Sequence, residues 1–308
     1  MRNIAYKRKR TNDNIVVESY FKENNSSSKP PFVILTGMNV MPRSNLLDKE
    51  GAYSELEKSS YLGAFPFVLA KETNKNVFVV YQPGVCKNSR DKKIYSASTT
   101  LKQFNQATLL GEKVYLITHS LASVGALEIL AGNLDYSDIK GKIIGMTISS
   151  PFTNAKDCYL YKGKDRELFG IKIIEIAKRT RELVDRFPFL SFLPQVHLGA
   201  SQFWQDGNIE TEKNKNWRLS RLFKAKSLGY ILDYDGIKRA KDCRNNIPSQ
   251  ILITNEDKLC SPEKQREIGK NANIPTMEIN SGHRWFTSEI NILEKVVREI
   301  NQHYCFIN

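Results

Sequence analysis

Short apolar segments rich in β-branched residues alternate with longer amphipathic segments along most of the chain. The short segments predict strands, most of them buried, at residues 15–21, 32–35, 77–81, 114–117, 143–148, 251–254 and 275–279. Segments with apolar residues three and four positions apart predict helices at residues 55–72, 99–110, 122–130 and 288–302. This alternation predicts an α/β fold with a mostly parallel sheet and helices on both of its faces.

The alternation stops between Pro151 and Asn246, where no strand is predicted. A connection of about 95 residues is far longer than the usual link between elements, so it indicates an insertion. We therefore expect a core formed by residues 1–151 and 247–308, and a helical insertion at residues 152–246 with helices at 166–187 and around 217–231. The insertion holds 19 Lys and Arg residues against 12 Asp and Glu residues, about half of the chain's net charge of +13.

Composition restricts the compartment and the partners. Five cysteines, odd in number and without a CxxC pair, indicate reduced thiols rather than disulfides or a metal site. The first residues are polar and basic, and no apolar run is long enough to be a secretory signal or a membrane span, so we expect a cytoplasmic protein.

The positive charge would suit peripheral contact with an anionic membrane. No nucleic-acid partner is predicted, because no strand interleaves aromatic with basic residues. The oligomeric state is not predicted.

The segment Thr118-His119-Ser120-Leu121-Ala122 lies between a predicted strand and a predicted helix. A serine on such a sharp turn has a strained backbone, and the residues two positions away must be small, so Gly-x-Ser-x-Gly is the usual pattern. Thr118 and Ala122 stand in place of those glycines. Ser120 is therefore the candidate nucleophile, and the alternative is a serine that caps the following helix.

A histidine and an acid follow the last two predicted strands in an order that suits a catalytic triad. His283 is the candidate base, because a serine hydroxyl becomes nucleophilic when an imidazole accepts its proton. Asp257 is the candidate acid that orients the imidazole, and Glu256 is the second choice. A solvated or helix-capping role is the alternative for His283, and a turn-forming role is the alternative for Asp257.

Two backbone amides would be needed to stabilise the oxyanion of such a reaction. Leu121 follows the candidate nucleophile and supplies the first amide. Met38 is expected to supply the second, because Gly37 permits a sharp turn after the strand at residues 32–35. Gly37 is therefore also assigned to the substrate site, although an ordinary glycine turn remains the alternative.

These motifs resemble those of the α/β-hydrolase superfamily. The resemblance rests on Thr36-Gly37, Tyr81-Gln82-Pro83-Gly84, Thr118 to Ala122, Asn255-Glu256-Asp257 and Ser281-Gly282-His283. It covers residues 1–151 and 247–308, and implies an eight-stranded sheet, no cofactor and a lid inserted after the sixth strand. The layout is similar to that of monoacylglycerol lipases and lysophospholipases. The chain departs from the family pattern at Thr36, where a histidine often stands, and at Thr118.

Residues 187–194 supply five large apolar side chains to the predicted lid. Phe189 and Phe192 are the candidate substrate contacts, because they could line an acyl-sized pocket or rest on a bilayer. The alternative is that these side chains only pack the insertion on the core.

The leading hypothesis is a serine hydrolase that cleaves a lipid-like or small acyl ester through an acyl-enzyme, with no metal or other cofactor. An acyltransferase or thioesterase on the same fold is one alternative. Another is an inactive scaffold that binds an anionic partner through the basic insertion.

Overall fold

A computed structural model describes residues 4–13, 15–22, 29–37, 62–83, 95–161, 164–165, 167–168, 171–192, 194–196, 222–244 and 246–307. Its centre is an eight-stranded sheet in the order β1-β2-β4-β3-β5-β6-β13-β14. The strands are β1 (Ile4–Arg10), β2 (Val16–Lys22), β3 (Phe32–Leu35), β4 (Val77–Val80), β5 (Val114–His119), β6 (Ile143–Ser149), β13 (Ser249–Thr254) and β14 (Thr276–Ile279). The predicted α/β class is confirmed, as is a sheet of eight strands.

Strand β2 runs opposite to the other seven strands of the sheet. β1 pairs antiparallel with β2, and β2 pairs antiparallel with β4. From β4 through β3, β5, β6 and β13 to β14 every pairing is parallel. The carboxyl ends of these strands therefore meet at one edge of the sheet, which is where α/β folds place their ligands.

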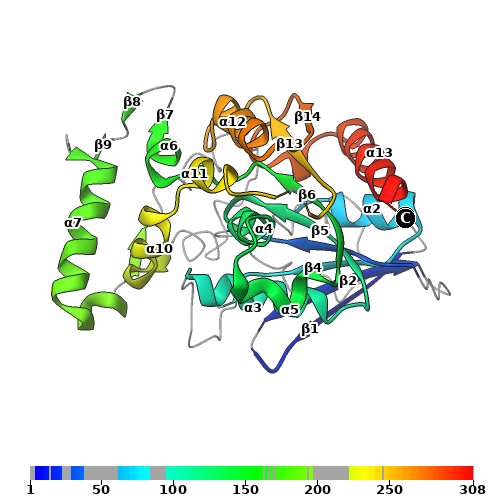
Figure 1. The fold of residues 1–308 in the computed structure, drawn as a ribbon, viewed down its shortest axis with the longest axis horizontal. Coiled ribbons are helices and arrows are strands. Elements are labelled where there is room, and N and C mark those ends of the chain that lie inside the picture. The colour runs from blue at the N-terminus through cyan, green and yellow to red at the C-terminus, as the bar shows by residue number, and fades with distance from the viewer. Residues whose placement is uncertain are drawn as a thin grey trace, which may run out of the picture.

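Helices cover both faces of the sheet (Figure 1). One face packs against α2 (Phe65–Thr73) and α13 (Ile290–Ile307) in a single apolar cluster with side chains from the strands. The other face packs against α3 (Ala97–Thr108), α4 (Ser123–Leu130), α5 (Ser137–Lys140) and α12 (Pro262–Ala272). The apolar runs of the central strands β3, β5 and β13 are thus buried on both sides, as parallel sheets require.

The segment between β6 and β13 adds no strand to the central sheet within its described part. It contains α6 (Ala155–Tyr159), α7 (Ile173–Arg186), the 3-10 helix η4 (Pro188–Phe192), η6 (Ala225–Ser227), α10 (Leu228–Asp233) and α11 (Gly236–Ala240). Its strands form two-stranded antiparallel ribbons: β7 (Leu160–Tyr161) with β8 (Lys164–Asp165), β9 (Glu167–Leu168) with β10 (Ile171–Lys172), and β11 (Pro194–Val196) with β12 (Leu222–Lys224). Figure 1 shows α7 at the far end of this segment, beyond α10.

Several element boundaries differ from the sequence prediction. The helix expected at residues 166–187 begins only at Ile173, because β9 and β10 occupy the residues before it. The helix expected around 217–231 is replaced in its described part by β12, η6 and the short helix α10. The helix expected at 55–72 begins at Phe65, and residues 55–61 lie outside the described part of the chain. No described helix is long and apolar enough to cross a bilayer.

Candidate active site

Ser120 lies at the turn where β5 ends and the helical segment leading into α4 begins. Its backbone φ angle is +54°, a value that residues other than glycine rarely adopt, and 9% of its surface is exposed to solvent. The 3-10 helix η2 (Ser120–Ala122) follows directly and continues into α4. The backbone strain expected of a serine held on a sharp strand-to-helix turn is therefore present, even though Thr118 and Ala122 replace the usual glycines.

Gly37, two residues after the end of β3, makes a close backbone approach to this turn. A Cβ atom added to Gly37 would lie 2.7 Å from the carbonyl oxygen of His119, 2.9 Å from Cβ of Ser120 and 3.0 Å from the amide nitrogen of Leu121. Any side chain at this position would collide with the turn. The chain after β3 thus passes beside the amide of Leu121, while Met38, the second predicted oxyanion donor, lies outside the described residues.

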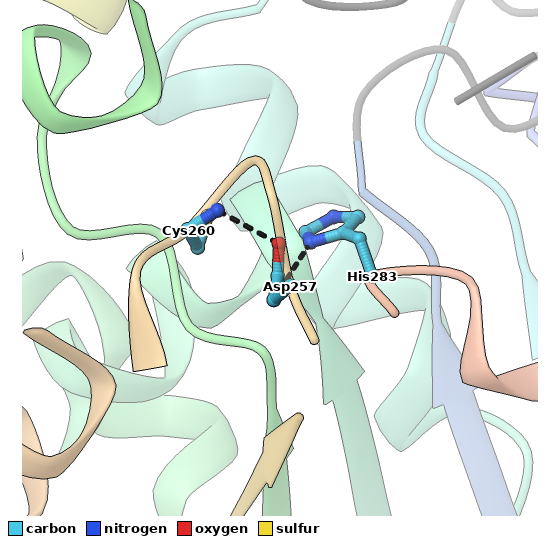
Figure 2. A group of neighbouring side chains, drawn as sticks. All are labelled: Asp257, Cys260 and His283. Carbon is cyan, nitrogen blue, oxygen red and sulfur yellow. Dashed lines mark hydrogen bonds and ion pairs between the residues drawn. The ribbon is translucent and has the colours of Figure 1, made fainter. Parts of the chain in front are cut away.

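The carboxylate of Asp257 is buried in the loop after β13 and accepts five hydrogen bonds. Oδ1 accepts the backbone amides of Leu259 and Cys260, both at 2.8 Å. Oδ2 accepts the hydroxyl of Thr254 at 3.0 Å and the side-chain amide of Gln265 at 3.1 Å. The fifth partner of the carboxylate is an imidazole nitrogen. Figure 2 shows the carboxylate between this imidazole and the amide of Cys260.

His283, in the loop after β14, supplies that imidazole. Its Nδ1 lies 2.7 Å from Oδ2 of Asp257, and both side chains are almost completely buried (Figure 2). A carboxylate in this position holds the proton on Nδ1, which leaves Nε2 as the basic nitrogen of the neutral ring. Two of the predicted site residues, which are 26 positions apart in the sequence, are therefore brought together by the fold.

His119 connects this pair with the serine turn. Its ring centroid lies 4.7 Å from that of His283 and 4.6 Å from that of Phe286. Complete burial, with the neighbouring His283 and Arg284 contributing further, holds the pKa of His119 well below its ordinary value. The residue before Ser120 is therefore a neutral imidazole at neutral pH, and it packs directly on the candidate base.

Two buried glutamines support the site and were not identified from the sequence. Gln103 of α3 donates to the carbonyl oxygens of Thr36 and Val80, at 3.0 and 2.8 Å, and so holds the ends of β3 and β4 together. Gln265 of α12 donates to Asp257 and, at 2.6 Å, to the carbonyl oxygen of Cys260. For Gln103, the only signal in the sequence is its place on the apolar side of a predicted helix. For Gln265 there is no such signal, because helix α12 was not predicted.

The insertion packs against the same region of the core. Leu228 and Ile231 of α10 and Ala177 of α7 share an apolar cluster with Leu121 of the serine turn and Cys260 of the acid loop. The candidate substrate contacts Phe189 and Phe192 belong to η4, beyond α7, and their residue surfaces are 74% and 61% exposed. The insertion therefore contacts the core beside the candidate triad, while η4 carries its phenylalanines on the surface.

A cavity of about 900 Å³ lies within the insertion, between α6, α7 and α10. None of the three candidate triad residues lines it. Many of its lining side chains are charged, and Arg181 forms an ion pair with Asp233 there. This cavity does not suit an apolar acyl chain, because a bound chain would remove the charged lining side chains from water at a large cost in free energy.

Asp257, Cys260 and His283 are the described residues whose donor atoms lie close enough to suggest a metal site, within 4.8 Å of one another. The distance of 2.7 Å between the carboxylate oxygen and the imidazole nitrogen is that of a hydrogen bond. Two ligands of one zinc ion, with bonds of about 2.0–2.2 Å, would lie roughly 3.3 Å apart. The arrangement is therefore that of an acid–base pair.

No protein-family model and no curated protein sequence matches the chain. Solved structures do match over nearly its whole length. A monoacylglycerol lipase from Paleococcus ferrophilus has a TM-score of 0.59 at 16% identity, over 97% of this chain and 99% of that one. An alpha/beta hydrolase from Penicillium sp. sh18 has a TM-score of 0.64 at 11% identity, over 98% and 99% of the two chains. A thioesterase domain from the curacin biosynthetic pathway has a TM-score of 0.54 at 14% identity, over 97% and 99%. The sheet order, the site at its carboxyl edge and these similarities together establish that this chain has the α/β-hydrolase fold.

Proposed function

We propose that this protein is a serine hydrolase that cleaves a carboxylic ester, lipid-like or with a small acyl group, through an acyl-enzyme. Ser120 is the nucleophile, His283 the general base and acid, and Asp257 the group that orients His283. The observation that carries the proposal is the buried Asp257–His283 pair. The imidazole of this pair packs on His119, which directly precedes Ser120, a serine with a positive φ angle. Similar structures that include a lipase and a thioesterase support the same class of acyl chemistry.

In the proposed reaction Nε2 of His283 accepts the hydroxyl proton of Ser120 as the oxygen attacks the ester carbonyl. The tetrahedral intermediate places its negative charge on the former carbonyl oxygen, where the amides of Leu121 and Met38 donate hydrogen bonds. His283 then donates the proton to the departing alcohol, which leaves an acyl group on Ser120. A water molecule, deprotonated by the same imidazole, then attacks the acyl carbonyl, and His283 returns the proton to Oγ of Ser120 as the carboxylic acid departs.

The proposal assigns residues 152–246 the role of a lid over a core of residues 1–151 and 247–308. The apolar cluster that joins α7 and α10 to Leu121 supports this role, because it seats the insertion beside the nucleophile. Helix α11 packs on the core instead: its Ala240 belongs to the core cluster together with side chains of α4 and α12. We also propose a cytoplasmic location, since Cys243, Cys260 and Cys305 are thiols rather than disulfides.

Steady-state and burst kinetics with p-nitrophenyl esters test this function. Wild-type protein should release an initial burst of p-nitrophenol that approaches one equivalent per enzyme if deacylation is slower than acylation. The Ser120→Ala variant should lose both burst and turnover, whereas Ser137→Ala, which alters an exposed serine of α5, should retain them. Wild-type protein that binds esters without turnover, or a Ser120→Ala variant with full turnover, would contradict the proposal.

A further inference from the structure

Large apolar side chains are exposed mainly on one part of the insertion. Nine such side chains are exposed in the described part of the chain, and five of them lie between residues 171 and 192. Four of the five, Leu183, Phe187, Phe189 and Phe192, form what we call the aromatic patch. Single exposed apolar residues are normal on soluble proteins, but a concentration of this kind marks a surface that contacts another apolar phase.

Local geometry holds the aromatic patch together at the end of α7. The amide of Phe187 donates to the carbonyl oxygen of Leu183 at 2.8 Å, and the rings of Phe187 and Phe189 lie 6.0 Å apart. Phe189 and Phe192 are three residues apart within η4, and side chains at this spacing in a 3-10 helix lie on the same side. The patch is therefore a local cluster of Leu183 and three aromatic rings rather than a set of scattered side chains.

The exposure of this segment argues against one alternative from the sequence, that its side chains only pack the insertion on the core. Side chains that pack the insertion on the core would be buried, as Ala177 is on α7. Phe189 and Phe192 are instead mostly exposed. Among the described residues, the apolar contacts of the insertion with the core come from α7 and α10, and the rings of Phe189 and Phe192 take no part in them.

Basic side chains flank the aromatic patch. The guanidinium of Arg186 lies 5.5 Å from the centre of the Phe187 ring. The ammonium of Lys224, on the neighbouring strand β12, donates to the carbonyl oxygen of Phe192 at 3.0 Å. Aromatic rings bordered by Lys and Arg are the composition of segments that lie at a membrane interface, with the rings at the acyl boundary and the cations at the lipid phosphates.

We infer that the aromatic patch docks this protein on the surface of an anionic lipid bilayer, with Phe189 and Phe192 inserted below the headgroups. Arg186 and Lys224 then face the phosphates, and the basic excess of the whole insertion, 19 Lys and Arg against 12 Asp and Glu residues, favours the anionic surface. This inference goes beyond the proposed hydrolysis and does not require it. A bilayer is favoured over a protein partner because the patch combines exposed aromatic rings with flanking cations.

Vesicle co-sedimentation of the Ser120→Ala protein tests the inference without any hydrolysis of the lipid. The probes are vesicles of phosphatidylcholine alone and of phosphatidylcholine mixed with phosphatidylglycerol. The test variant carries Phe189→Ala and Phe192→Ala, and the matched control carries Phe306→Ala, which removes a 90% exposed ring at the end of α13. Thermal denaturation verifies that each variant is folded.

We expect binding to the mixed vesicles that weakens as salt is added, because salt screens the charge attraction. The double variant should bind roughly 10- to 100-fold more weakly, given the apolar area of two phenylalanines, and the Phe306→Ala protein should bind like its parent. Arg186→Gln with Lys224→Gln should reduce the preference for mixed over neutral vesicles. Absence of binding to mixed vesicles, equal binding by the double variant, or a patch-dependent dimer in sedimentation equilibrium without vesicle binding would each overturn the inference. Because every arm lacks Ser120, none of these outcomes depends on whether the protein is a hydrolase.

Discussion

Replacement of Asp257 by asparagine should block the base while it preserves the shape of the site. The carboxylate accepts two bonds at Oδ1 and three at Oδ2, all from donors. An asparagine can keep its oxygen on the amides of Leu259 and Cys260, but its NH₂ group then faces Thr254, Gln265 and His283. The imidazole can relieve this conflict by accepting at Nδ1 and carrying its proton on Nε2. It then has no lone pair for the proton of Ser120.

The magnitude follows from that change of tautomer. The same substitution in another triad lowers kcat by about 10⁴, equivalent to roughly 5 kcal/mol of transition-state stabilisation. We expect a loss of this size in the turnover of p-nitrophenyl acetate by Asp257→Asn, with its circular dichroism spectrum retained. The matched control is Glu256→Gln, which removes an exposed carboxylate one residue away and should change the rate little. An Asp257→Asn protein within roughly tenfold of wild type, or a loss confined to Glu256→Gln, would refute the reasoning.

Three further predictions concern the residues around the site and the stability of the fold. Gly37→Ala should lower kcat/KM by up to about 10²- to 10³-fold, because the added methyl group displaces the turn that carries an oxyanion donor. The kinetic control is Gly141→Ala, because a Cβ atom added at Gly141 meets only open space. Burial lowers the pKa of His119 in the folded protein, so the unfolded chain binds an extra proton as the pH falls below about 6.5. The melting temperature should therefore fall more steeply from pH 7 to 5 in wild type than in His119→Gln. Equal slopes in the two proteins would contradict this role of His119. Glu18 is fully buried and accepts three tyrosine hydroxyls, so Glu18→Ala should reduce the urea-derived free energy of unfolding by more than about 3 kcal/mol; a loss below about 1 kcal/mol would show that the cluster contributes little to stability.

The central strands could be predicted because they are buried on both faces. Residues 32–35 and 114–117, for example, are uninterrupted apolar runs, and only a doubly covered strand needs such a run. The apolar pattern does not predict β1, because β1 is an edge strand with a basic sequence, and the side chains of Lys7, Lys9 and Arg10 are exposed. Its pairing with β2 depends on tertiary context that an apolar pattern does not reveal.

The residues of the candidate site were easier to identify than the contacts that support them. Asp257 and His283 could be proposed because each follows an apolar strand, and parallel strands place their carboxyl ends at one edge. The packing of His119 on His283 could not be proposed, because it depends on how the loop after β14 folds back. The two supporting glutamines were missed for a similar reason: a polar residue on a helix gains its meaning from the loop ends that it reaches.

Covalent labelling with a fluorophosphonate, followed by peptide mapping, tests the central claim most directly, since the phosphorus forms a bond only with an activated hydroxyl. The account predicts modification at Ser120, none in Ser120→Ala, a sharp decrease in His283→Ala and unchanged labelling in Ser137→Ala. A label that maps to another residue, or that persists in full when Ser120 is removed, would contradict it.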